Sequence, residues 1–289
     1  MRYPSAAGTF YSTDKKEIKS EIEGYLTAAE KDMEEASKKE DILKELLEFR
    51  YQLGFIVPHA GHAYSGHVAA YAYSLMKKLP KNTSFIIIGP NHTGRGGMIA
   101  LSQEDWETPL GTVKNDRELG DLIRRNSNIV DYDETAHAFE HSIEVQLPFL
   151  QLISQTTSKN LRVVEISMGM QDYEFAEDLS NAINRATKDI ERPVVVIASS
   201  DMTHFEPAEN AERKDKEALS LIEELNSDGF FSFVRSRNLS ICGYGPITTL
   251  MLFASKNNGK SKLLKYANSG DVTGDYSSVV GYASIAFYK

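Results

Sequence analysis

The run Val194-Val-Val-Ile-Ala-Ser-Ser200, followed directly by Asp201-Met-Thr-His204, decides the fold class of this chain. A short run this apolar is typical of a strand that is buried on both faces, as in a parallel sheet. Similar runs occupy residues 53–57, 85–89 and 161–167. The stretches between the runs are long enough for crossover helices. The sequence therefore predicts an α/β fold with a central, mainly parallel sheet flanked by helices, in which residues 193–199 form one strand.

The remaining segments fit around this sheet. Residues 14–50 alternate charged and apolar positions with helical period, which predicts a peripheral helical segment with one solvated face. Two further β-like runs, 263–268 and 279–288, lie near the C-terminus. The sequence contains no internal repeat and no linker rich in Pro, Gly or Ser. We therefore interpret residues 1–289 as a single α/β domain.

Composition narrows the class of protein. The 289 residues are 41% hydrophobic and 25% charged, which suits a soluble globular chain. Acidic residues outnumber basic ones by 41 to 32, so nucleic acid is not an expected partner. The start lacks the apolar core of a signal peptide, and no apolar run approaches the roughly 20 residues of a membrane span, so we expect no membrane partner. The single cysteine excludes an internal disulfide and suits a reducing cytoplasm, where we expect the protein to reside.

Polar residues follow three of the predicted strands. His59 comes shortly after the run 53–57, and His92 follows the run 85–89. Asp201 and His204 come directly after the run that opens this section. Ligands of open α/β sheets bind beyond the carboxyl ends of the strands, where such loops converge. We therefore expect these four side chains to share one edge of the sheet.

Other candidate residues have plainer explanations. His62 and His67 lie where the chain turns into a helix predicted over 65–79, and we interpret both as structural. His137 lies in an acidic loop, where solvation alone would explain it. Cys242 would by residue type be a small buried hydrophobe. The glycines and proline of Gly243-Tyr-Gly-Pro246 indicate instead a tight loop, from which a thiol could reach a metal.

Seven blocks in order span almost the whole chain: Tyr3–Tyr11, Pro58–Gly61, Gly89–His92, Trp106–Gly111, Glu140–Glu144, Ser199–His204 and Cys242–Gly243. In type, order and spacing these blocks resemble the Memo protein family. The fold of that family is in turn similar to that of the class III extradiol ring-cleaving dioxygenases. Those enzymes hold non-haem Fe(II) at the edge of an α/β sheet, and the resemblance implies the same architecture here.

The resemblance also implies a functional site. It implies a metal centre formed by His59, His92 and Cys242. It implies further residues of the same pocket, to which we assign catalytic roles as predictions: Asp201, His204, His141 and Tyr64. His204 is the candidate general base, because the ordinary imidazole pKa of about 6.5 lies near working pH. Asp201 is expected to accept the second ring N–H of a ligating histidine.

The types of ligand limit which metal ions the site would bind. Two imidazoles and one anion leave open positions on a first-row metal, as non-haem Fe(II) oxygenases require. The dioxygenases use a carboxylate as the anion, whereas Cys242 offers a thiolate, a softer ligand that also suits Cu(I) and Zn(II). We expect Fe(II) or Cu, with Zn as a third option. Glu140 and Glu144 are interpreted as capping or solvating a helix that begins near Ser142.

Two classes of function remain open. One is a metal-dependent oxidoreductase of dioxygenase type. The other is a non-catalytic module that binds metal or a peptide in the same cleft. The predicted pocket loops contain no evident arginine clamp for a carboxylated aromatic substrate, and the chain has no Gly-x-Ser-x-Gly elbow of a classical hydrolase. The substrate or physiological ligand and the oligomeric state are not encoded in these patterns.

Overall fold

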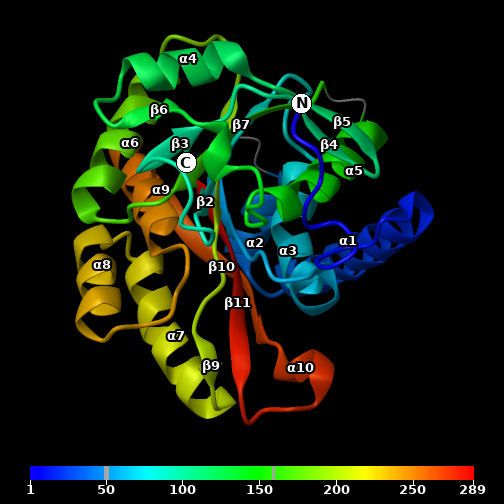
Figure 1. Cartoon of the computed structure of the whole chain (residues 1–289). Helices are drawn as coiled ribbons and strands as arrows, with labels where there is room; N and C mark the ends of the chain where they lie inside the picture. The colour runs from blue at the N-terminus through cyan, green and yellow to red at the C-terminus, as the bar shows by residue number, and fades with distance from the viewer. Residues whose placement is uncertain (49–51, 158–159) are drawn as a thin grey trace.

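A four-stranded parallel core lies at the centre of the sheet. The computed structural model describes residues 1–48, 52–157 and 160–289, and Figure 1 traces them from blue to red. Neighbouring strands of the core follow the order β1-β8-β2-β7, and every adjacent pair is parallel. Their bounds are Gln52–Val57 (β1), Val194–Ser199 (β8), Ser84–Pro90 (β2) and Arg162–Met168 (β7). The prediction that the four apolar runs form one parallel sheet is confirmed, with strand ends that differ by at most one residue.

Antiparallel strands extend this core on both sides, so the sheet as a whole is mixed. The long C-terminal strand β11 (Val279–Tyr288) pairs antiparallel with β1, and β10 (Lys260–Asn268) pairs antiparallel with β11. At the other edge β3 runs antiparallel to β7 and parallel to β6. The remaining short strands are β3 (Ile99–Leu101), β4 (Trp106–Thr108), β5 (Gly111–Asn115), β6 (Val130–Tyr132) and β9 (His204–Glu206). The β-like runs predicted at 263–268 and 279–288 lie in β10 and β11, whereas their antiparallel pairing was not part of the sequence prediction.

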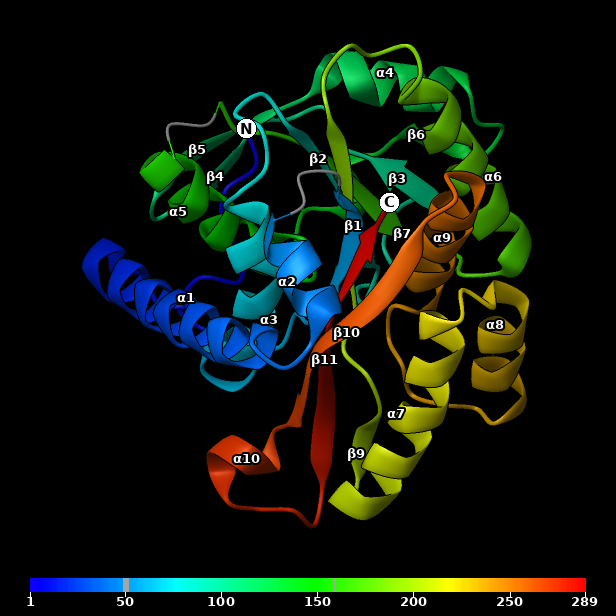
Figure 2. The same ribbon diagram turned by 180° about the vertical axis from the view of Figure 1, so that it is seen from behind.

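Helices cover both faces of the sheet, as Figures 1 and 2 show from opposite sides. Alternation along β1 explains the two layers, because Phe55 and Val57 pack into one apolar cluster and Ile56 into the other. The first layer contains α1 (Lys15–Ser37), α2 (Asp41–Glu48), α3 (His62–Met76) and α5 (Leu147–Thr157). The second contains α4 (Arg117–Arg125), α6 (Tyr173–Ala186), α7 (Ala208–Glu223), α8 (Ser227–Ser236) and α9 (Tyr244–Lys256).

The N-terminal helix α1 packs against α3 on the outer side of the first layer (Figure 2). The Asp14 carboxylate caps its first turn by accepting two backbone N–H groups. Ile18, Ile22, Leu26 and Met33 form the buried stripe that the helical period of the sequence indicates. Residues 49 and 50, at the end of the segment predicted to be helical, lie outside the described residues.

Helix α3 begins three residues earlier than the sequence predicts, at His62 rather than Ser65, and ends at Met76 rather than Leu79. Its first residue is fixed from outside, because the His62 N–H donates to the Phe10 carbonyl at 2.8 Å. The N-cap, Gly61, offers no side-chain acceptor. The start of this helix therefore carries no local sequence signal of the usual kind.

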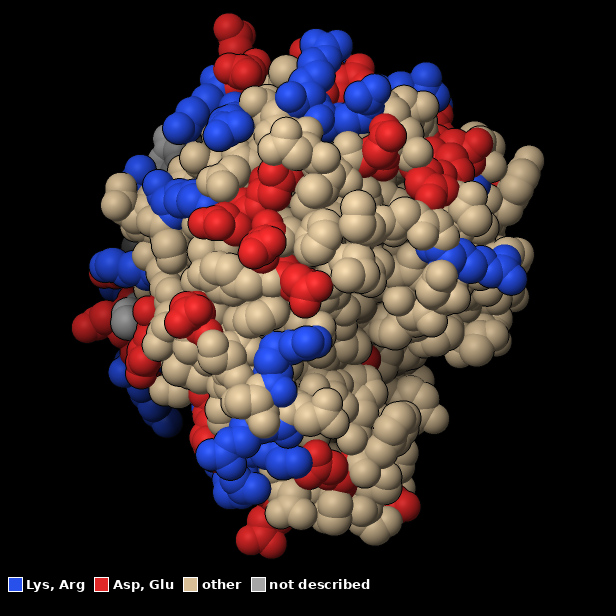
Figure 3. Space-filling view, turned by 60° about the vertical axis from the view of Figure 1, so that its left-hand side comes forward, with Lys and Arg blue, Asp and Glu red and all other residues tan. Residues whose placement is uncertain are grey.

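Three single-turn helices complete the secondary structure of the described residues. One-turn 3-10 helices span Glu134–Ala136 and Glu144–Gln146, and α10 (Gly270–Thr273) is a single turn. No helix in the described part of the chain combines the length and apolar character that crossing a bilayer requires. Basic and acidic side chains are interspersed over the face drawn in Figure 3, in keeping with the mixed charge of the sequence.

Candidate metal centre

A cleft of about 300 Å³ lies beyond the carboxyl ends of β1, β2 and β8. The register brings these ends together, because Val57 pairs with Ser199 and Ile88 with Ala198. The residues that line the cleft come from the loops after these strands and from nearby segments: Phe10, His59, Ala60, Gly61, His92, His141, Asp201, His204 and Val280. Tyr64 is not among these lining residues. It lies beside Gly61 on the first turn of α3 and is 45% exposed.

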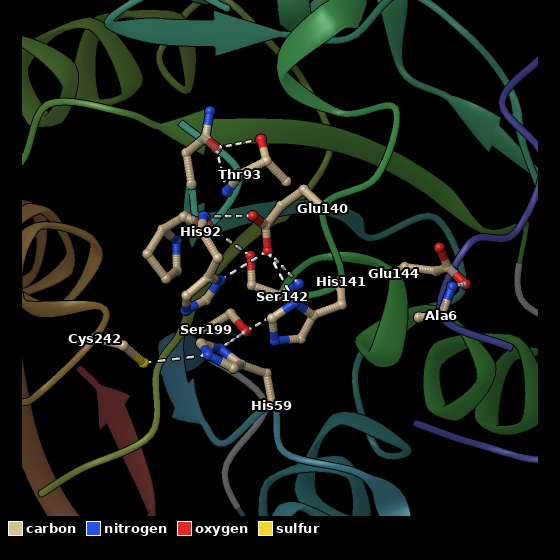
Figure 4. Close-up of polar contacts among 12 residues, drawn as sticks. Ala6, His59, His92, Thr93, Glu140, His141, Ser142, Glu144, Ser199 and Cys242 are labelled. Atoms are coloured by element: carbon tan, nitrogen blue, oxygen red, sulfur yellow. Dashed lines mark hydrogen bonds and ion pairs between the residues drawn. The ribbon is translucent and has the colours of Figure 1, made fainter. Parts of the chain in front are cut away.

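The three candidate metal ligands converge at this edge of the sheet. One potential ligand atom from each of His59, His92 and Cys242 lies within 4.8 Å of the other two. The His59 Nε2 and Cys242 Sγ atoms are 3.2 Å apart, and Figure 4 shows both side chains pointing toward each other. Two imidazole nitrogens and one sulfur are a donor set that suits Zn, Cu or Fe. The residues present therefore fit a first-row transition metal.

His92 is held on its Nδ1 side by the buried carboxylate of Glu140. Glu140 Oε1 lies 2.9 Å from His92 Nδ1, and Oε2 accepts the backbone N–H of His92 at 2.5 Å. Oε1 also accepts the Ser142 N–H at 2.8 Å. These bonds and the neighbouring His92 lower the pKa of Glu140 to about 2, against the opposing effect of burial. Glu140 therefore does more than cap or solvate the following turn, the role expected from the sequence, and leaves His92 Nε2 as the free ring nitrogen.

His59 is held on its Nδ1 side by a serine. Its Nδ1 lies 3.0 Å from the hydroxyl of Ser199, the last residue of β8, and the ring is almost fully buried. Burial, and then the neighbouring histidines, lower the pKa of His59 well below its usual value. The ring is therefore neutral at physiological pH, which is the form that binds a metal.

Cys242 lies on the loop that leads into α9, close against β8. Gly243 makes this approach feasible, because a Cβ there would lie 2.6 Å from both the Ser199 carbonyl oxygen and the Ser200 Cβ atom. The Asp201 N–H points at Cys242 Sγ over 3.3 Å. Burial and then the nearby Asp201 carboxylate raise the pKa of the thiol. A bound cation would be needed to stabilise the thiolate here.

Asp201 makes a different contact from the one expected of it. Its Oδ1 accepts the backbone N–H groups of His59 at 2.7 Å and Ala60 at 3.3 Å. The expected position, beside the second ring nitrogen, is occupied instead by Ser199 Oγ at His59 and by Glu140 Oε1 at His92. Burial raises the pKa of Asp201. Asp201 thus fixes the backbone of the His59 loop at the floor of the cleft.

His141 and His204 both line the cleft. The His141 ring stacks between Phe10 and His92, with centroid distances of 4.2 and 4.6 Å. Burial lowers the pKa of His141 to about 4. His204 is held by its backbone N–H, which donates to Ser240 Oγ at 2.7 Å, and its buried Nδ1 has no hydrogen-bond partner within the described residues. Its ring is therefore the less constrained of the two.

Three buried polar residues near the cleft have structural contacts. His62 is buried, and its Nε2 lies 2.9 Å from the Val145 carbonyl oxygen, in agreement with the structural interpretation. His137 is fully buried, and solvation does not explain it: its carbonyl accepts Arg2 Nε at 3.0 Å. Glu144 is also fully buried and forms an ion pair with Arg2, so it anchors the N-terminus instead of capping a helix.

Sequence reasoning missed the residues behind the histidines. Ser199 is the last residue of an apolar strand. Gln146 contacts it, because its Nε2 donates to Ser199 Oγ at 2.9 Å. Phe10 reaches the cleft from a loop far away in the sequence. Two signals were available in the sequence. One was Glu140, an acid directly before a histidine, and the other was the polar residue Ser199 at the end of a buried strand.

The chain matches a known family over almost its entire length. The family described as Memo-like protein matches residues 2–286. A MEMO1 family protein of Methanocaldococcus jannaschii is 44% identical over 291 residues, which cover 98% of both chains. Relatives from Methanosarcina mazei and Saccharolobus islandicus, both named as MEMO1 family proteins, are 43% and 41% identical; each alignment covers 99% of this chain, and 98% and 99% of the respective relative. This chain therefore belongs to the Memo family.

Proposed function

We propose that this protein binds one transition-metal ion through His59 Nε2, His92 Nε2 and Cys242 Sγ. The observation that carries the proposal is the convergence of these three donors while both rings are already occupied on their Nδ1 sides. Partners on the far ring nitrogen fix the orientation of metal-binding histidines. The buried His59 ring and the nearby Cys242 thiol form one side of this arrangement, and His92 closes it from the strand end of β2.

Fe(II) and Cu are the proposed ions, with Zn as the third option. Three protein ligands on one side leave positions open toward the cleft, which distinguishes such a site from a closed structural zinc site. When bound, an iron or copper ion would supply redox chemistry and polarise an oxygen ligand at those positions. We propose an oxidoreductase of dioxygenase-like type in the cytoplasm, a compartment in which a lone thiol stays reduced.

The residues of the cleft have distinct parts in this proposal. His204 acts as the general base, because its ring lines the cleft and is the least constrained by hydrogen bonds. Asp201 holds the His59 loop in place through its backbone contacts. His141 and Phe10, stacked on each other, form an aromatic wall that a ligand in the cleft would contact. Tyr64, at the edge of the site, is assigned only a contact with the outer part of a ligand.

Anaerobic elemental analysis of freshly purified protein tests the metal site. We expect about one equivalent of metal in the wild type and a loss in His59→Ala and Cys242→Ala. His67→Ala is the matched control, because His67 is a half-buried histidine of α3 outside the cleft. Equal metal content in all four proteins would contradict the proposed ligand set.

Oxygen uptake on catechols then tests the catalytic part. We expect His204→Ala to keep its metal and lose turnover, whereas His59→Ala loses metal first. The opposite ranking would show that ligand and base have been exchanged. A metal-loaded wild type without oxygen uptake on any catechol would favour the alternative, a non-catalytic module that binds metal or a peptide in the same cleft.

A further inference from the structure

The buried amide of Gln146 has one orientation that its neighbours allow. Its Nε2 lies 3.0 Å from the Pro58 carbonyl oxygen and 2.9 Å from Ser199 Oγ, while its Oε1 accepts the Tyr73 hydroxyl at 2.5 Å. A carbonyl oxygen can only accept, so the atom beside Pro58 must be the NH2 group. Gln146 therefore donates to the Ser199 hydroxyl oxygen.

The Ser199 hydroxyl has a single proton, and that proton is already used. The hydroxyl donates to the Ser142 carbonyl oxygen at 2.6 Å, a strong contact between fully buried groups. Its oxygen accepts an N–H of Gln146. Toward His59 Nδ1, at 3.0 Å, only a lone pair remains, so the ring nitrogen must carry the hydrogen. Because all these groups are buried, water does not compete for the contacts.

A neutral imidazole carries one ring proton, so a hydrogen on Nδ1 leaves a lone pair on Nε2. That Nε2 atom is the one that faces Cys242 Sγ. We propose that Ser199 and Gln146 are positioning residues that lock His59 in its Nδ1–H tautomer, so that the metal-binding nitrogen is preset in the metal-free protein. The inference rests on the proposed function only in naming Nε2 as a ligand, since the tautomer itself follows from the hydrogen bonds.

One segment determines the Nδ1 contacts of both His59 and His92, as the dashed contacts of Figure 4 show. The Ser142 carbonyl orients the Ser199 hydroxyl, and the Ser142 N–H donates to Glu140 Oε1. Glu140 in turn lies against His92 Nδ1. Residues 140–146 therefore supply the acceptor for one ring and direct the acceptor for the other. With Nδ1 of each ring engaged by these contacts, Nε2 is the nitrogen that each ring has left for a metal.

Nitrogen NMR of the metal-free protein tests the lock directly. Long-range nitrogen–proton spectra of protein labelled with 15N-histidine distinguish the two tautomers, and the His59 signals are assigned by their loss in His59→Gln. We expect the Nδ1–H tautomer in the wild type and in Ser199→Thr, which retains the hydroxyl. Ser199→Ala should show a mixture. Ser167→Ala is the matched control, because Ser167 is a buried serine of β7 whose hydroxyl has no partner within the described residues.

Titration with Zn²⁺ alone gives the second readout. We expect Ser199→Ala to bind Zn²⁺ about 10–100-fold more weakly than the wild type, the usual cost of losing such a partner, with Ser199→Thr restoring the affinity and Ser167→Ala retaining it. An Nε2–H tautomer in the wild type would overturn the inference even if Ser199→Ala failed to fold. So would a Ser199→Ala protein with unchanged tautomer and affinity. A wild type that holds the Nδ1–H tautomer but binds no metal would instead refute the proposed function alone.

Discussion

Replacing Glu140 with glutamine should destabilise the protein by an amount that depends on pH. Glu140 is fully buried and accepts three N–H groups, two from His92 and one from Ser142. Glutamine keeps one acceptor oxygen and turns an NH2 group toward an N–H donor. An N–H donor that faces the NH2 group loses its acceptor, which costs free energy.

The lowered pKa of Glu140 gives the size of the expected loss in folding free energy. A shift from 4.5 to about 2 is about 2.5 pKa units, which corresponds to roughly 3 kcal/mol of folding free energy. Because the folded-state pKa lies below the unfolded one, this contribution is fully present above about pH 4.5. It is lost as the pH falls toward about 2 and the carboxylate of the folded state becomes protonated.

Urea unfolding at a series of pH values is the assay. At pH 7 we expect Glu140→Gln to unfold with a free energy about 3 kcal/mol below the wild type, and the difference to shrink steadily below about pH 4.5. Glu34→Gln, at an exposed position of α1, is the control and should change stability by less than about 0.5 kcal/mol. A Glu140→Gln protein as stable as the wild type at pH 7, or a difference that persists unchanged at acidic pH, would refute the reasoning.

Three further changes test the surrounding framework, each by urea unfolding. Arg2→Met should cost about 3–5 kcal/mol, because it leaves the buried carboxylate of Glu144 without its ion pair, and a loss below 1 kcal/mol would contradict this. Burial raises the pKa of Glu165, so the stability that its protonated carboxyl contributes is present at acidic pH and is lost as the pH rises. Glu165→Gln should therefore become more stable relative to the wild type from pH 4 to pH 8, and a difference in unfolding free energy that stays constant over this range would argue against it. Gly89→Ala should cost about 1–3 kcal/mol and lower metal content, because a Cβ would lie 2.3 Å from Ser142 Oγ; normal values of both would show that the loop tolerates displacement.

The sheet was predictable because its central strands are buried on both faces. Four apolar runs identified β1, β2, β7 and β8 with ends correct to within one residue. The antiparallel edges were not predictable in the same way, since half-buried strands such as β10 carry a weaker pattern. The start of α3 was misplaced because its first turn is fixed by the Phe10 carbonyl, which is distant in the sequence.

The candidate site was likewise predictable only in part. His59, His92, Asp201 and His204 were expected at one edge because they follow strand ends, and they line one cleft. The contacts behind them could not be read from spacing. Ser199 lies 140 residues from His59 along the chain, and its hydroxyl meets the ring only because β1 and β8 are neighbours. Local patterns report which residues reach an edge, whereas the proton positions there depend on partners from across the sheet.

Cobalt titration tests the central claim most directly, since a cysteine thiolate bound to Co²⁺ gives a near-ultraviolet charge-transfer band that histidine and carboxylate ligands do not. We expect the metal-free wild type and the His67→Ala control to develop this band up to one equivalent of Co²⁺. Cys242→Ser should bind Co²⁺ without the band, and His92→Ala should require more Co²⁺ to reach saturation. A wild type that binds one equivalent of Co²⁺ with no thiolate band, or that binds none, would contradict a metal centre formed by His59, His92 and Cys242.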